Sequence, residues 1–128
     1  MDLNQITVPC ADYEASVEFY RQLGLRQIVN SPPRYARFET TPGTTFSIYL
    51  ADVDTDTSDI VVYFEVDDVD ATVLALQEKG IEFDSEPHDQ DWLWREAYLS
   101  DPAGNQLCIY HAGDNRRSPP WRIEDDAV

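Results

Sequence analysis

The chain contains an internal repeat, and this duplication limits its fold more than any other feature. The run DYEASV that begins at Asp12 returns as DVDATV from Asp68, 56 residues later. A second run, GTTFSIY from Gly43, returns as GNQLCIY from Gly104, 61 residues later. Two copies of one supersecondary unit in a 128-residue chain indicate a duplicated half-domain, and two such halves can face each other and enclose a cavity.

Each copy reads as a strand, a helix and three further strands. Asp12 and Asp68 are predicted helix N-caps, and Gly24 and Gly80 stand where a left-handed C-terminal residue ends a helix. The apolar helix stripes are Tyr13, Val17 and Tyr20, and then Val69, Val73 and Leu76. Strands are predicted at 5–10, 25–30, 34–39, 44–50, 61–66, 81–84, 95–100 and 105–110.

These elements predict an α+β fold of two tandem βαβββ modules that form an open, curved mixed sheet around a cavity. We expect one domain over residues 1–111, with module one at 1–52 and module two at 59–111. Residues 112–128 show no periodicity and are interpreted as a C-terminal tail.

The charge of the chain is strongly negative, with 9 Lys and Arg against 25 Asp and Glu, a net charge of −16. Such a chain repels phosphates, so we expect neither nucleic acid nor an anionic membrane as a partner. We expect no secretory signal and a cytoplasmic location, with Cys10 and Cys108 as reduced thiols. The acidic surface has two interpretations, adaptation to a salt-rich cytoplasm and ordinary acidic composition.

Strand alternation divides the side chains of each module between a face on the helix and an opposite face. The opposite face is predicted to carry tyrosine rings, hydroxyls and amides with few aliphatic groups, which is typical of a surface that binds a small ligand. The alternatives are a dimer interface and a filled second core. The predicted ligand-binding residues are Gln5, Thr7, Tyr35, Arg37, Ser47, Tyr49, Tyr63, Glu96, Tyr98, Cys108 and Tyr110.

Three segments carry a resemblance to a known family: VPCADYEASVEFYRQLGL at 8–25, YFEVDDVDA at 63–71 and DPAGNQLCIY at 101–110. They resemble the vicinal oxygen chelate superfamily, which contains glyoxalase I, bleomycin-resistance proteins, fosfomycin-resistance enzymes and extradiol dioxygenases. The resemblance covers about residues 4–111. It implies paired βαβββ modules that curve into an open barrel, commonly completed as a homodimer, so a homodimer is expected here.

The resemblance also implies where a metal would lie. Enzymes of the superfamily hold a divalent metal with residues from the first and last strand of each module, and these positions are Gln5, Ser47, Val61 and Cys108 here. Val61 has no ligand atom and a serine hydroxyl is a poor ligand, so fewer than three good donors remain. We predict a degenerate metal site and no cofactor, with a divalent metal at an atypical site as the alternative.

Glu65 and Glu96 are the candidate catalytic residues, since a carboxylate desolvated among tyrosines can have a raised pKa and act as a general base. The structural alternative pairs each glutamate with Arg37 or Arg95. His88 and His111 are interpreted as surface or packing residues.

Five extra residues in the second copy place Trp92, Trp94 and Arg95 in a stretch predicted to form an aromatic rim over the cavity. Packing of the two indoles against the tail or a partner chain is the alternative.

Three functions are compatible with these residues. The leading one is a small-molecule-binding protein of the bleomycin-resistance type that performs no chemistry. The second is a lyase or isomerase of the glyoxalase type, or a dioxygenase-related enzyme, with an atypical metal site. The third is a dimeric accessory domain whose cavity is filled by side chains.

Overall fold

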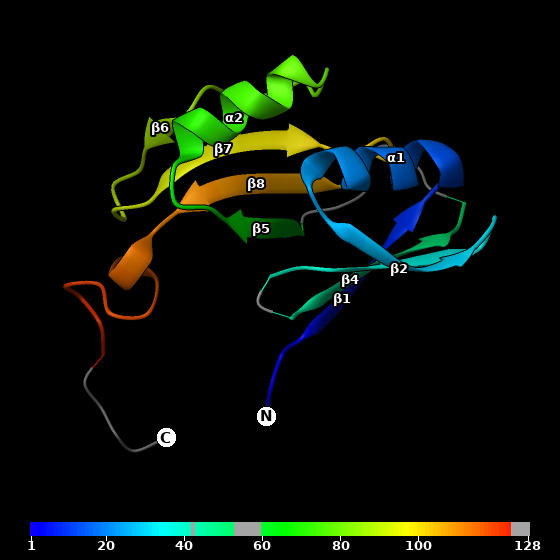
Figure 1. The fold of residues 1–128 in the computed structure, drawn as a ribbon. Helices are drawn as coiled ribbons and strands as arrows, with labels where there is room; N and C mark the ends of the chain where they lie inside the picture. Colours follow the sequence, from blue (N-terminus) through cyan, green and yellow to red (C-terminus); the bar gives the residue numbers. More distant parts are fainter. Residues whose placement is uncertain (42, 53–59, 124–128) are drawn as a thin grey trace.

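The computed structural model describes residues 1–41, 43–52 and 60–123, which form two successive βαβββ modules (Figure 1). The first contains β1 (Gln5–Cys10), α1 (Tyr13–Leu23), β2 (Arg26–Ser31), β3 (Tyr35–Glu39) and β4 (Thr45–Leu50). The second contains β5 (Val61–Glu65), α2 (Val69–Glu78), β6 (His88–Asp89), β7 (Arg95–Ser100) and β8 (Gln106–His111), followed by the 3-10 helix η1 (Gly113–Arg116). The predicted α+β fold is confirmed.

Each module forms its own four-stranded mixed sheet, in the orders β1-β4-β3-β2 and β5-β8-β7-β6. The first and last strands of each module pair in parallel, and the remaining pairs are antiparallel. The fold is therefore open. In Figure 1 the helices lie along one side of the two sheets. We call the sheet faces turned away from the helices the first open face (β1, β3, β4) and the second open face (β5, β7, β8).

Both helices begin and end as predicted. The Oδ1 atom of Asp12 accepts a hydrogen bond from the Ala15 amide at 3.0 Å, and Asp68 does the same for Ala71 at 3.0 Å. Gly24 follows α1 with φ of 109°, a left-handed value at which a glycine has no steric cost. The duplicated sequence thus encodes the same cap twice.

One hydrophobic core joins the two modules through the helix sides of their sheets. The rings of Phe46 on β4 and Phe64 on β5 meet at 5.9 Å between centroids. The Tyr20 hydroxyl of α1 donates to Oδ2 of the buried Asp101 at 2.6 Å, and the Asn105 side chain donates to the Pro9 carbonyl at 2.8 Å. These buried contacts fix one module against the other.

The strand predicted at 81–84 is wrong, because the structure places the short strand β6 at His88–Asp89 instead. Ile81 is buried in the core. The alternation of polar and apolar residues at 81–84 therefore reflects burial and not pairing with another strand. The Asp84 amide does donate to the Tyr98 carbonyl at 2.7 Å. The Tyr98 amide, however, donates to the Ser85 hydroxyl at 2.9 Å, and this side chain takes the place of a backbone acceptor.

Most of the predicted linker and the end of the predicted tail, residues 53–59 and 124–128, lie outside the described residues. Neither α-helix in the described part of the chain has the length and hydrophobicity that a membrane-crossing helix requires.

Candidate functional site

The first open face carries a hydrogen-bonded set of polar side chains from three strands. The Nε2 atom of Gln5 donates to the Ser47 hydroxyl and to the Thr7 hydroxyl, the latter at 3.2 Å. The Tyr35 hydroxyl donates to the same Ser47 oxygen at 2.9 Å, and Nε of Arg37 donates to the Tyr35 oxygen at 2.8 Å. The strand register explains this grouping, because Thr7 and Arg37 both lie opposite Ser47. Five predicted ligand-binding residues are thus neighbours.

The environment of Tyr35 combines burial with two hydrogen-bonding neighbours. Burial opposes ionisation, but the Ser47 hydroxyl and the Arg37 guanidinium beside the phenol outweigh it, so the pKa of Tyr35 is lowered. The Arg37 guanidinium carbon also lies 5.4 Å from the centroid of the Tyr35 ring. Tyr49, which lies opposite Tyr35, is 44% exposed at the edge of this set.

The second open face carries aromatic rings. Trp94 and Tyr110 stack with centroids 4.8 Å apart, and Tyr63 meets them edge-on at 5.8 and 5.4 Å. We call these three residues the ring cluster. Tyr63 is 43% exposed, whereas Tyr110 is buried. The cluster therefore presents one ring to solvent and uses the other two to cover the sheet.

Glu96 lies beside the ring cluster and is completely buried. Its Oε1 atom accepts from Gln90 at 3.0 Å and from the Tyr98 hydroxyl at 2.9 Å, and its Oε2 atom accepts from the Trp92 indole at 3.2 Å. All three donors are neutral, so the expected ion pair of Glu96 with Arg37 or Arg95 is wrong. Gln90 was not predicted as a site residue, and the five-residue insertion was the only sequence signal near it.

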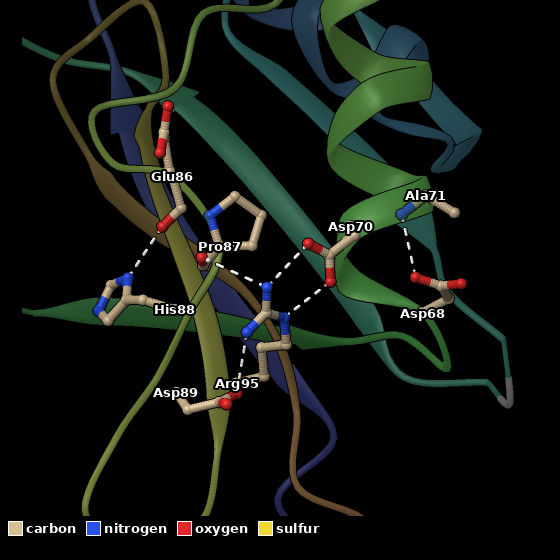
Figure 2. Close-up of polar contacts among 8 residues, drawn as sticks. All are labelled: Asp68, Asp70, Ala71, Glu86, Pro87, His88, Asp89 and Arg95. Atoms are coloured by element: carbon tan, nitrogen blue, oxygen red, sulfur yellow. Dashed lines mark hydrogen bonds and ion pairs between the residues drawn. The ribbon is translucent and has the colours of Figure 1, made fainter.

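Arg95 faces the helix side and does not join an aromatic rim. Figure 2 shows its guanidinium between Asp70 at the start of α2 and Asp89 of β6. Nε and Nη2 bind the two oxygens of Asp70 at 2.7 and 2.8 Å, and Nη1 binds Asp89 at 3.0 Å. Hydrogen bonds from Arg95 lower the pKa of Asp70. The side chain thus fastens the β6–β7 hairpin to α2.

His88 lies at the same hairpin with its Nδ1 atom 2.8 Å from the Glu86 carbonyl, as Figure 2 shows. Its Nε2 atom lies 2.7 Å from the Gln90 amide nitrogen. Nδ1 of His111 lies 2.8 Å from the Val66 carbonyl. Both histidines thus have a ring nitrogen within hydrogen-bond distance of a backbone carbonyl.

Glu65 anchors the segment after β8 and does not stand as a poised base. Its Oε2 atom accepts from the backbone amides of Ala112 and Gly113 at 2.8 and 2.9 Å, and the Arg116 guanidinium lies 3.7 Å from Oε1. Burial opposes ionisation, yet these amides, His111 and Arg116 together lower the pKa of Glu65. The direction is opposite to the raised pKa expected for a general base, and the expected partners Arg37 and Arg95 are replaced.

The four family metal positions do not fit a divalent ion. Gln5 and Ser47 are hydrogen-bonded to each other, and Val61 offers no donor atom. Burial, followed by the nearby charge of Glu96, raises the pKa of the Cys108 thiol to about 12, so it stays protonated near neutral pH. Within the described ranges, no three His, Cys, Asp or Glu side chains gather in a way that could hold a metal ion.

A hollow of about 460 Å³ lies beside β2 and the end of α1. None of the predicted ligand-binding residues lines it. The lining residues are Arg21, Leu25, Arg26, Gln27, Ile28, Val29 and Asn30.

Known proteins resemble this chain in sequence and in fold. The uncharacterized protein YraH of Bacillus subtilis (strain 168) is 33% identical over 125 residues, covering 86% of this chain and 98% of that protein. A glyoxalase/bleomycin resistance protein/dioxygenase from Nocardioides has 26% identity and a TM-score of 0.71, with 88% of this chain and 83% of that chain covered.

Two solved structures named for bleomycin share the fold at lower identity. The bleomycin resistance determinant encoded on transposon Tn5 has 20% identity and a TM-score of 0.73, with 87% of this chain and 98% of that chain covered. A bleomycin-binding protein complexed with bleomycin has 19% identity and a TM-score of 0.72, with the same coverage. Residues 2–109 match the family model, and the chain therefore belongs to the Glyoxalase/Bleomycin resistance protein/Dioxygenase superfamily.

Proposed function

We propose that the protein binds a small organic molecule on the open faces of its sheets, without a divalent metal at the family positions. The observation that carries this proposal is the ring cluster of Tyr63, Trp94 and Tyr110, which lies on the sheet face turned away from α1 and α2. Aromatic side chains there offer a planar ligand ring contacts that a purely solvated face lacks. The bleomycin complex of a protein with the same fold supports this use of the fold.

The donor chemistry supports binding rather than metal-assisted catalysis. A protonated Cys108 thiol, an apolar Val61 and the paired side chains of Gln5 and Ser47 make a poor ligand set. Glu96 already accepts three hydrogen bonds from neutral donors, which leaves little freedom to take a substrate proton. The glyoxalase-type alternative therefore has less support.

A specific observation favours the filled-cavity alternative for part of the second open face. Cys108, Tyr110 and Ala112 are buried there, with Trp94 and Tyr98 packed against them. We infer that only the outer rim of this face, near Tyr63, contacts a ligand, and that the expected homodimer would cover the adjoining apolar surface.

The proposal is tested by adding a library of planar aromatic fragments and following the indole N–H signals in a ¹⁵N-correlated NMR spectrum. We expect some fragments to shift the signals of Trp92 and Trp94, because both indoles lie at the second open face. Tyr63→Ala should weaken the best fragment about fivefold or more, through loss of an exposed ring contact.

Trp121→Ala is the matched control, since Trp121 is an exposed ring outside both modules. A fragment affinity that this variant leaves unchanged supports the assignment. Fragments that shift only the Trp121 signal, or a library that shifts neither the Trp92 nor the Trp94 signal, would contradict the proposed function.

A further inference from the structure

We infer that Arg37 on the first open face binds the carboxylate of an aromatic acid. The inference rests on the proposed function and specifies the class of ligand. It starts from an imbalance of charge in a chain of net charge −16. The half-buried Arg37 guanidinium stands on a face of hydroxyls and amides, and no carboxylate in the described part of the chain pairs with it.

Arg37 differs from the other half-buried arginine of the chain. Arg95 forms ion pairs with Asp70 and Asp89. Arg37 uses Nε to donate to the Tyr35 oxygen, and among the residues that the structure describes, no hydrogen bond or ion pair reaches its Nη atoms. A guanidinium held by Nε alone keeps its planar outer edge available for two parallel hydrogen bonds, the geometry that a carboxylate fits.

The surroundings of Arg37 hold it in place and leave its charge uncompensated. The Tyr35 hydroxyl that receives Nε is itself fixed by its bond to Ser47 at 2.9 Å. Glu39 lies two residues further along the same face of β3, but its carboxylate is 3.7 Å from the Arg26 guanidinium. The nearest acid of this strand is therefore already engaged, and an incoming carboxylate would supply the missing counter-charge.

The position of the ligand's aromatic ring follows from the next residue pair on the same face of the sheet. Tyr49 lies opposite Tyr35 and is 44% exposed, two register steps away from the pair formed by Arg37 and Ser47 and on the same face. A ligand ring that contacts Tyr49 therefore places a directly attached carboxylate toward Arg37. This arrangement favours small aromatic carboxylates over their neutral amides.

Calorimetric titration with 2-naphthoate and its neutral match 2-naphthamide tests the inference at moderate salt, which screens the overall negative charge. We expect naphthoate to bind about tenfold or more tightly than naphthamide. Arg37→Gln should reduce this preference to within about twofold. Arg34→Gln is the control, because it removes the same charge from an exposed site just before β3.

Arg37→Lys keeps a positive charge without the planar fork, so it should retain only part of the preference and provides a second, conservative variant. Equal affinities of the wild type for the two compounds would overturn the inference and leave the proposed function standing. A preference that survives in Arg37→Gln would overturn it as well. If neither compound binds, the inference fails, and the fragment library decides separately whether the proposed function fails with it.

Discussion

Glu65 connects the end of β5 to the segment after β8 through two backbone amides, and its lowered pKa makes this contact dependent on pH. A carboxyl whose pKa is lower in the folded state stabilises the protein above its unfolded pKa, near 4.5, and loses this contribution as the pH falls through the folded value. We expect Glu65→Gln to lower the free energy of unfolding at neutral pH by roughly 1 kcal/mol. Denaturant titrations between pH 3 and pH 7 measure the difference.

The difference between the wild type and Glu65→Gln should shrink below about pH 4.5. Glu82→Gln is the control, because Glu82 is exposed and has no hydrogen bond or ion pair among the described residues. A constant difference across this pH range would contradict the assigned role of Glu65.

Cys108 is a buried thiol whose pKa is raised to about 12. At pH 8 nearly every molecule therefore carries the protonated thiol and not the thiolate, which is the form that alkylating reagents and metals bind. We expect iodoacetamide to modify Cys108 in the folded protein far more slowly than in the protein unfolded by urea. Peptide mass spectrometry of a time course measures both rates. Rapid modification of the folded protein, or its suppression by added zinc, would contradict this account.

Each of the two α-helices begins at an aspartate that caps its N-terminus. Asp12 and Asp68 each accept a backbone amide at 3.0 Å. Replacement of an N-cap aspartate by alanine costs about 1 kcal/mol, so Asp12→Ala and Asp68→Ala should lower the free energy of unfolding by similar amounts. Asp67→Ala is the control, since Asp67 precedes the Asp68 cap. A larger effect of Asp67→Ala would contradict the assignment of the cap.

The elements that alternation and caps encode could be predicted from the sequence, while those set by tertiary contacts could not. β7 has the predicted bounds, Arg95–Ser100, because polar and apolar side chains alternate along it. The strand expected at 81–84 is absent because the Ser85 side chain, and not a backbone carbonyl, accepts the hydrogen bond from the Tyr98 amide of β7, and β6 pairs with β7 further along, through His88 and Asp89. The turn before β7 places Leu93 at φ of 69°, a conformation rare for such a side chain, so local sequence carried no signal for it.

The candidate site also has one part that the sequence predicts and another part that tertiary contacts determine. Strand parity places Tyr35, Arg37 and Ser47 on one face, and this grouping follows from the sequence alone. The contacts of Gln90 and Trp92 with Glu96 required the conformation of the β6–β7 turn, which strand parity does not reach. Parity also does not report burial, so the complete burial of Glu96 was not predicted.

At the scale of the whole molecule, the excess of negative charge opposes the compact state through self-repulsion. Added salt screens this repulsion, since the Debye length falls from about 30 Å at 0.01 M to about 3 Å at 1 M. We expect the Tm to rise between these two concentrations of sodium chloride. Differential scanning calorimetry at both concentrations measures the change, with an equal osmolality of sucrose as the control. A Tm that stays constant or falls would remove the salt-adaptation interpretation.

The duplication leaves the molecule with one shared core on the helix sides and two open faces on the other. We place ligand binding on these faces and assign no role in it to a metal at Gln5, Ser47, Val61 or Cys108. The most direct measurement is the Kd of the best aromatic fragment, determined by calorimetry before and after dialysis against EDTA. We predict the same Kd in both samples. Binding that disappears with EDTA and returns with zinc or manganese would contradict the account.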